Sequence, residues 1–491
     1  MSQRLFMRNA LGSILLIVTL IGGTAASAEA VQFRVSSQTL GDAYQLVTVD
    51  EDLLNRRRLH QYLRLGAYDL MSDGSYSLNV HTLMRFDTDL GVTRQELDRV
   101  VGAQPASLSV QSAFIDGRRL LGASEFNLNF KAGRFLHIDA LDFLMLDGAT
   151  VSVTTPWYIG VEILAGLESR NLTNPVTDSQ FELDGARIIE NDALSDAPSI
   201  VLGAALMLTG LNSTRAKLSY RRMFSNQQPF RLQDAGATIV AEKTSTSPDG
   251  ESGSVSGVDS EKIGLSLFHN FWRTVDLNGV VSYDLYNAVV DQTNVLARWR
   301  MTDAWDVSGQ YVRIVPTFDA DSIFNIFTIH PLNDANMRVR WHLSDNQRIY
   351  AGGMLRLFGN EKPTEVQAQV DTSVKAYGAM AGYYQSYGHE GRFGADVSAE
   401  LGYGGSRIMG DLWGMWAPYP KQLEIDGRLT VVHVDQDLQP NLHALSVGYQ
   451  LGAKYLLGDV AGISVLVEHN FNRIHKNQFR LFAVIDLDVW L

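Results

Sequence analysis

Residues 445–455 read LSVGYQLGAKY, in which every odd-numbered position is apolar and every even-numbered position is polar or small. Because successive side chains of a β-strand point to opposite faces, this segment predicts a strand with one apolar and one polar face. The same alternation recurs in residues 335–343, 392–403 and 423–431. The repeated pattern predicts an all-β protein.

Two all-β architectures alternate in this way, the soluble β-sandwich and the transmembrane β-barrel. The predicted strands run to about 11–15 residues, which is long for a soluble sheet and close to the length of a tilted membrane strand. Nearly every polar face carries charged residues, as expected of a wet interior. Tyrosine and tryptophan recur near segment ends, where a membrane barrel places its interfacial aromatics: Tyr68, Trp157, Tyr283, Tyr350, Tyr383, Trp416 and Trp490. The sequence therefore favours the transmembrane barrel.

The N-terminus has the pattern of a secretory signal peptide. Arg4 and Arg8 precede an apolar run over residues 11–21, and small residues follow with cleavage positions after Ala28 or Ala30. The run is shorter than the ~20 residues that a membrane-spanning helix needs. We therefore expect the chain to be exported and this segment to be removed.

The remaining chain, residues 31–491, is expected to form one barrel domain, with residues 1–30 as the signal peptide. The formal charge of −13 argues against a nucleic-acid partner. The absence of cysteine excludes disulfides, thiolate metal sites and cysteine nucleophiles. No Gly-x-Ser-x-Gly or His-Glu-x-x-His motif occurs, so neither an enzyme nor a metal or other cofactor is expected.

The connections predict the strand count. Bacterial barrels have short periplasmic turns and long extracellular loops, and short and long connections interleave along this sequence. The longer connections are predicted at residues 88–106, 136–146, 170–196, 225–260, 317–332 and 359–371. With a first strand at residues 31–46, the interleaving gives an up-and-down antiparallel barrel of about 22 strands, or 18 to 20 if some are lost, with both termini periplasmic. The main extracellular loops are expected near 88–106, 170–196, 225–260 and 317–332.

The C-terminal segment, from Phe479 to Leu491, alternates apolar residues up to the last position. It resembles the C-terminal strand of Gram-negative outer-membrane barrels, although that family usually ends in Phe or Trp and this chain ends in Leu491 after Trp490. The resemblance implies an outer-membrane location, recognition by the barrel-assembly machinery, and contact with lipid and lipopolysaccharide. The oligomeric state stays open.

The interior is expected to be a channel, because strand-like sequence starts directly after the signal peptide and leaves no room for an N-terminal plug domain. Residues 133–148 are strongly apolar for an external connection. They either fold inward and constrict the pore or form ordinary strand ends that pair near the rim. In the first case four side chains face the channel: Arg134, His137, Asp139 and Asp142. The framing dipeptides, Gly133-Arg134 and Asp147-Gly148, resemble a strand pair of phosphate-selective and alginate-type porins.

Basic residues recur on the faces expected to line the lumen. Four of them have the fewest acidic residues nearby and are the candidate pore-lining residues for an anion track: Arg298, Arg300, Arg338 and Arg340. The alternative is a structural network in which inward acids such as Asp276 neutralise them, and this is the interpretation we favour.

The function predicted from the sequence is a porin-like outer-membrane channel for passive passage of hydrophilic solutes, with anions as one candidate class. A dedicated export conduit for a polysaccharide and a structural or adhesive barrel are the alternatives.

Overall fold

The computed structural model describes the strands and most short turns, and thirteen ranges are covered: residues 31–47, 53–70, 76–90, 106–121, 125–169, 199–209, 211–225, 257–315, 331–358, 375–402, 405–436, 444–472 and 477–491. The predicted signal peptide and most of the predicted extracellular loops lie outside these residues. Within the described ranges, no helix has both the length and the apolar character needed to cross a membrane.

The described residues form twenty-two strands. The first eleven are β1 (Gln32–Val47), β2 (Leu53–Tyr68), β3 (Ser77–Asp89), β4 (Ala106–Arg118), β5 (Asn127–Ile138), β6 (Phe143–Thr154), β7 (Ile159–Glu168), β8 (Ile200–Leu208), β9 (Thr214–Ser225), β10 (Gly257–Phe271) and β11 (Val275–Asp284). The others are β12 (Val289–Arg300), β13 (Trp305–Ile314), β14 (Leu332–Ser344), β15 (Gln347–Phe358), β16 (Lys375–Ser386), β17 (Gly391–Gly402), β18 (Gly405–Tyr419), β19 (Leu423–Gln436), β20 (Ala444–Leu457), β21 (Ala461–Phe471) and β22 (Gln478–Trp490).

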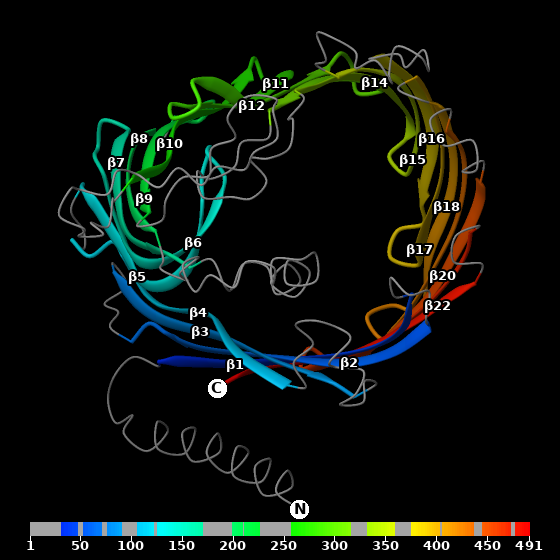
Figure 1. The fold of residues 1–491 in the computed structure, drawn as a ribbon, viewed down its shortest axis with the longest axis horizontal. Helices are drawn as coiled ribbons and strands as arrows, with labels where there is room; N and C mark the ends of the chain where they lie inside the picture. Colours follow the sequence, from blue (N-terminus) through cyan, green and yellow to red (C-terminus); the bar gives the residue numbers. More distant parts are fainter. Residues whose placement is uncertain are drawn as a thin grey trace, which may run out of the picture.

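The sheet closes on itself. Each strand pairs antiparallel with its sequence neighbours, and β22 pairs with β1 from Arg480↔Tyr44 to Trp490↔Arg34, so the blue and red ends of the chain meet in Figure 1. Closure satisfies the backbone groups that an open sheet would leave bare in a membrane. The predicted all-antiparallel barrel of 22 strands is confirmed.

Each strand has one apolar and one polar face, as the alternation predicted. The apolar side chains of β20 and β22, such as Leu451 and Ile485, are exposed, while the intervening residues carry the hydrogen bonds and ion pairs. A water-soluble protein would bury such side chains, whereas a bilayer solvates them. The apolar face is therefore the outer, lipid-facing surface, and the charged face lines the interior.

Long and short connections alternate over much of the ring, but those after β11 (residues 285–288) and β17 (residues 403–404) are as short as the turns. One predicted connection is also mostly strand. The connection predicted at residues 136–146 is mostly strand, because β5 continues to Ile138 and β6 begins at Phe143. Only residues 139–142 turn the chain. The apolar residues in this stretch belong to the two strands and do not mark a long loop.

Outward aromatic side chains gather at the end of the barrel that carries the short turns. They include Trp157, Trp272, Trp299, Trp305, Trp341, Trp416 and Tyr419. Trp305 and Trp341 stack with ring centroids 5.3 Å apart. This is the interfacial girdle expected of a membrane barrel. The girdle position predicted for Tyr350 is wrong, because its hydroxyl donates inward to Asp396. The positions predicted for Tyr68 and Trp490 are also wrong, because both rings lie on the inward face of their strands, where Arg34 lies over the Trp490 ring at 5.0 Å.

The hairpin of β5 and β6 leaves the wall of the barrel. β5 pairs with β4 only from Gly117↔Phe130 to Ala113↔Arg134, and β6 pairs with β7 only up to Leu146↔Glu168. Beyond these points the two strands pair with each other, and the Met145 carbonyl of β6 also accepts a hydrogen bond from the Ser169 amide at 2.9 Å. In Figure 1 β6 lies inside the ring, beside β8 to β10.

Contacts of the hairpin tip place it against the inner wall. Asp142 accepts a hydrogen bond from Arg221 of β9 and lies 4.0 Å from the Lys262 ammonium of β10. Leu141 is buried, and a Cβ added to Gly264 of β10 would meet its side chain at 2.6 Å. The tip therefore crosses the lumenal faces of β8 and β9 and reaches β10.

A small hydrophobic core forms between the hairpin and the wall. It contains Phe135, Leu144, Leu146, Leu164, Val201 and Met223, drawn from β5 to β9. These positions point inward in their strands, and inward apolar residues are buried only where a second layer covers them. The folded-over hairpin is that second layer.

Candidate functional site: the lumenal wall

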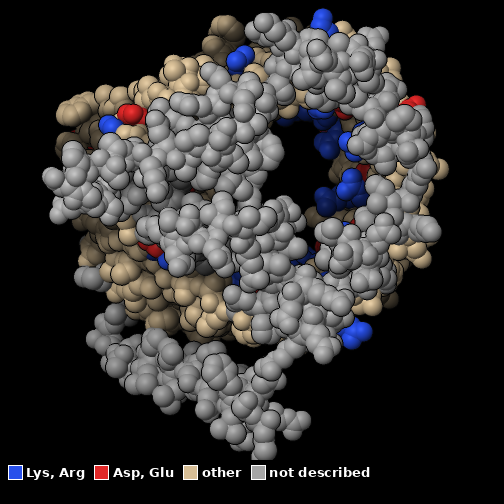
Figure 2. All heavy atoms as spheres, in the orientation of Figure 1, with Lys and Arg blue, Asp and Glu red and all other residues tan. Residues whose placement is uncertain are grey.

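A ladder of five arginines lies on the inward faces of three strands. We call these residues the basic ladder: Arg298 and Arg300 on β12, Arg338 and Arg340 on β14, and Arg348 on β15. The strand register brings them together, since Asp306 of β13 pairs with Arg300 on one side and with Arg340 on the other. Figure 2 shows Lys and Arg side chains on the inner wall, on the side that Figure 1 assigns to β14–β18.

Asp306 joins two arginines of the ladder, Arg298 and Arg340. Its carboxylate accepts hydrogen bonds from Arg298 at 3.0 Å, from Arg340 at 2.9 Å and from His342 at 2.8 Å. The residue is only 2% exposed. Charge-assisted bonds from three sides satisfy both oxygens, which is what a nearly buried carboxylate requires.

The ladder carries more positive than negative charge. Arg300 lies 3.2 Å from Asp276, which is the second carboxylate in contact with the ladder. Arg338 contacts the Met380 sulfur at 3.3 Å and lies over the Tyr350 ring at 4.6 Å, and neither partner is charged. Arg348 lies in the same way over Tyr384, at 4.2 Å. Among the described residues, these two guanidiniums have no carboxylate within ion-pair distance.

Two arginines further around the inner wall are matched by acids. Arg356 bonds both Asp334 at 2.9 Å and Glu400 at 2.8 Å, and Arg428 donates to Asp411 at 2.7 Å. Cross-strand pairs of this kind neutralise the local field. Arg356 and Arg428 therefore present less net charge to the lumen than Arg338 and Arg348.

Two aromatic side chains next to the ladder lie flat on the wall. A Cβ on Gly382 would clash with the Tyr350 ring, and a Cβ on Gly394 would meet Trp413, so each ring covers a neighbouring glycine. Tyr350 Oη donates to Asp396 Oδ1, and Trp413 Nε1 donates to the other oxygen at 3.2 Å. The glycines allow the rings to lie down, and the hydrogen bonds fix them.

Sequence reasoning missed these aromatic residues as part of the interior. The available signal was the parity of Tyr350, which falls on the polar face of its segment, together with glycines at inward positions of β16 and β17. Which ring covers which glycine depends on strand register, which the alternation alone does not determine.

We expect Tyr350→Phe to destabilise the folded barrel by about 1 kcal/mol, because one hydrogen bond to a carboxylate is lost while Trp413 keeps the other oxygen bonded. Urea titration of the purified protein, with folded and unfolded species separated on unboiled gels, measures the change. The matched control is Tyr311→Phe, whose exposed hydroxyl bonds Asn333 on the outer face, and its expected change is near zero. Equal effects of the two substitutions would contradict the assigned role of Tyr350.

The structure places the four candidates on the hairpin in two environments. Arg134 bonds Asp147 on one face of the hairpin. In the parts of β5 and β6 nearer the short turns, the same face points to lipid. His137 and Asp139 are buried, 3.4 Å apart, with Glu162 of β7 3.9 Å from His137. Asp142 binds the wall through Arg221. All but Arg134 hold the hairpin in place against the wall.

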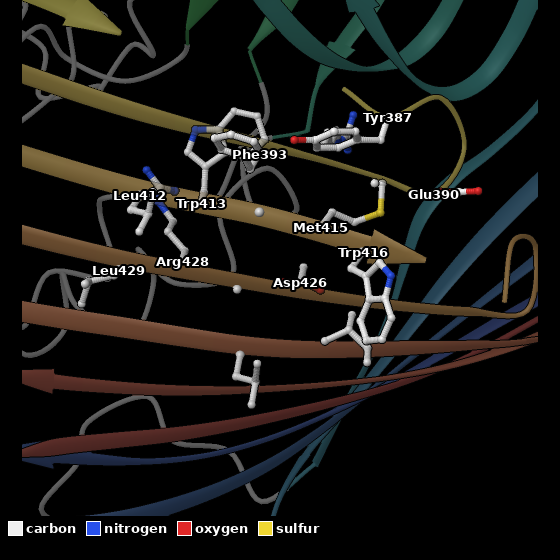
Figure 3. A pocket seen from close by; sticks show the side chains of 16 residues that line it. Tyr387, Glu390, Phe393, Leu412, Trp413, Met415, Trp416, Asp426, Arg428 and Leu429 are labelled. Carbon is white, nitrogen blue, oxygen red and sulfur yellow. The ribbon is translucent and has the colours of Figure 1, made fainter. Parts of the chain in front are cut away.

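A separate groove with a volume of about 730 Å³ lies on the outer surface over β17, β18 and β19 (Figure 3). Its exposed side chains include Leu412, Trp416 and Leu429, which are lipid-facing. Gly414 and Gly427 pair across the strands at its floor. Because it opens toward the bilayer, this groove is not part of the lumenal site.

Solved structures of outer-membrane proteins resemble this chain at low sequence identity. The outer membrane protein OpdK of Pseudomonas aeruginosa is 8% identical over 95% of this chain and 100% of its own, with a TM-score of 0.41. OccD3 (OpdP) of the same organism is 10% identical over 96% of this chain and 93% of its own, with a TM-score of 0.40. A mutant of the ferric enterobactin receptor PfeA of Pseudomonas aeruginosa is 11% identical over 93% of this chain and 80% of its own, with a TM-score of 0.49. No protein-family model matches the sequence, and no curated protein matches it significantly.

The closed antiparallel sheet, the lipid-facing apolar surface and the charged interior define a bacterial outer-membrane β-barrel of the porin-like class. The class and the outer-membrane location predicted from the sequence are confirmed. The apolar outer surface contacts membrane lipid.

Proposed function

We propose that the barrel is a passive channel for small hydrophilic solutes and that the basic ladder makes it favour anions. The observation that carries this proposal is the environment of Arg338 and Arg348, whose guanidiniums lie on aromatic rings and not on carboxylates. A paired arginine presents little net charge to a passing solute. Arginines over neutral rings keep their charge available, and a confined passage strengthens their attraction for anions.

The passage needs no catalytic step and no bound cofactor, since diffusion through a water-filled barrel is driven by the solute gradient. The partners that we propose are lipopolysaccharide at the outer surface and the barrel-assembly machinery at β22. Support for the second comes from β22 itself, which forms the closing seam with β1 and presents apolar side chains outward up to Leu491.

The charge-reversed variants Arg338→Glu and Arg340→Glu should each shift ion selectivity toward cations. The expected readout is a change of reversal potential in a salt gradient across a planar bilayer, and Arg338→Glu should give the larger change because Arg340 is already paired with Asp306. The matched control is Arg273→Glu, which makes the same charge change in an exposed short turn. Reversal potentials that are the same in all three variants and the wild type would show that the ladder does not set selectivity.

The alternatives predict different results in the same apparatus. A dedicated polysaccharide conduit that opens only with periplasmic partners would show no steady current alone, and a structural or adhesive barrel would show none under any condition. A steady current that reverses at an anion-selective potential separates the proposed channel from both.

A further inference from the structure

The inward fold of the β5–β6 hairpin leaves a break in the barrel wall. β4 runs from Ala106 to Arg118, but β5 accompanies it only as far as Ala113. A bulge in β4 follows at once, where Ser112 and Val110 oppose the consecutive residues Leu83 and Met84. From there to Ala106, β4 pairs with β3 on one side, and on the other side no described strand pairs with it.

Three glycines in register form the hinge of this break. Gly133 of β5 pairs with Gly148 of β6, which pairs with Gly166 of β7. Gly133 has φ +123°, a conformation that L side chains rarely adopt, and a Cβ on Gly148 would lie 2.6 Å from the Gly166 backbone. The strands can therefore turn away from the wall only at this row. Past the row, Arg134 Nη1 donates to the Val110 carbonyl at 3.3 Å and caps the first free position of the β4 edge.

The break lies at the depth of the membrane. Its residues, 106–112, are far enough from the short turn at Arg118 to stand about 15–30 Å along the barrel axis, allowing for a ~3.3 Å rise per residue and a ~40° tilt. The apolar band of such a barrel is about 25 Å tall. The edge of β4 with which no described strand pairs therefore begins within the hydrocarbon layer, where an unpaired backbone group would cost several kcal/mol. Water from the lumen or the polar group of a solute has to solvate it.

Folding over also reverses the faces of the hairpin. The residues with inward parity, such as Phe135 and Leu144, pack against the wall. The residues that would otherwise face lipid are turned toward the lumen, and Ile138 is 68% exposed and Phe143 67% exposed. On the other side of the break, Leu108 of β4 is 72% exposed on the lipid face. Exposed apolar side chains thus stand both inside the barrel and outside it, next to one opening in the wall.

We propose that this break is a side port, through which the alkyl chain of a single-chain amphipathic solute passes between the lumen and the bilayer. The chain would lie on Ile138 and Phe143 and leave past Leu108. Its polar head would stay in the lumen near the Arg134–Asp147 pair. This route differs from the axial passage of hydrophilic solutes, because it delivers material sideways into the membrane.

Access of lipid to the inward face is tested directly, because the chain contains no cysteine and a single introduced cysteine can be labelled alone. Bimane is attached to Ile138→Cys in the full-length protein, reconstituted with doxyl-labelled phosphatidylcholine as the quencher. Leu265→Cys on the lipid-facing side of β10 is the positive control. Leu296→Cys, whose 40% exposed side chain pairs in register with Gln310 on the inner wall, is the lumenal control.

The side port predicts quenching at position 138 of at least half that at position 265, with little at position 296. Quenching at 138 as weak as at 296 would overturn the proposal. Phe143→Cys repeats the measurement if the first variant does not fold, as judged by its mobility on unboiled gels. This measurement requires no open channel, so failure of axial conduction and failure of the side port are separate outcomes.

Chain binding is tested with alkyl sulfates, which share one head group and differ only in tail length. We expect dodecyl sulfate below its micellar concentration to block the channel current at concentrations at least tenfold lower than butyl sulfate. Phe143→Glu should abolish this difference by placing a carboxylate on the apolar path, whereas Leu296→Glu should keep it. A block that does not depend on tail length in the wild type, or that both variants change equally, contradicts the proposed route.

Discussion

Asp306→Asn should destabilise the barrel by about 3 kcal/mol and make the channel more selective for anions. The substitution removes the charge that holds Arg298, Arg340 and His342 together, and loss of one partner of a buried ion pair leaves the others uncompensated. Stability is measured by urea titration with folded and unfolded species separated on unboiled gels. Selectivity is measured as the reversal potential of the surviving folded channels.

The matched control is Asp276→Asn, which removes the same charge from an ion pair at the edge of the ladder. Arg300 and Asp276 are 50% and 29% exposed, so water replaces much of the lost interaction and the expected loss is below about 1 kcal/mol. Similar destabilisation by the two substitutions would mean that Asp306 is not the centre of the ladder. A stability loss without any change in reversal potential would place the ladder outside the ion path.

Gly148→Ala is the second substitution expected to have a large effect. The added methyl group would overlap the Ala165 carbonyl and approach the Gly166 Cα to 2.6 Å, and both are backbone atoms that cannot rotate away. We expect a loss of about 2–3 kcal/mol, the upper range for overpacking. Folded channels that accommodate the methyl group should carry a larger current, because the hairpin can no longer lie flat against the wall.

Gly410→Ala is the control for Gly148→Ala. No atom lies within 4 Å of the position that a Cβ would take at Gly410, so neither stability nor conductance should change. If Gly148→Ala behaved like Gly410→Ala, the row of glycines would not be a hinge and the inward fold would need another cause.

Most of the fold follows from the sequence, because each strand carries its own evidence. In residues 445–455 the alternation identifies the strand and its two faces without any knowledge of its neighbours. Connection lengths then give the number of strands, since a short turn has to join adjacent antiparallel strands. The same parity correctly placed Arg338 and Arg340 on the polar face of β14.

The inward hairpin could not be derived in the same way. The alternation of residues 127–138 is interrupted at Arg134 and Phe135, where the strand leaves its neighbour, but the interruption alone does not say to which side the strand turns. The signal is the alignment of Gly133, Gly148 and Gly166, which becomes visible only when the register of three strands is known. For residues 133–148 the sequence therefore left two alternatives open, an inward fold and ordinary strand pairing near the rim.

Partners of the arginines are also set by register. Asp306 lies six positions after Arg300 and thirty-four before Arg340 in the chain, yet it pairs with both across neighbouring strands. Composition indicated only that acids and bases are both frequent inside. The structure adds that some of them, such as Arg356 and Arg428, pair with acids, whereas Arg338 and Arg348 lie over aromatic rings.

The most direct test of the proposed channel is the current through single molecules of the purified full-length protein in a planar bilayer without any partner. The proposed function predicts a steady open conductance that is anion-selective and falls when neutral polymers small enough to enter the barrel are added. Absence of any conductance from protein shown to be folded on unboiled gels would contradict it and favour a structural or adhesive barrel.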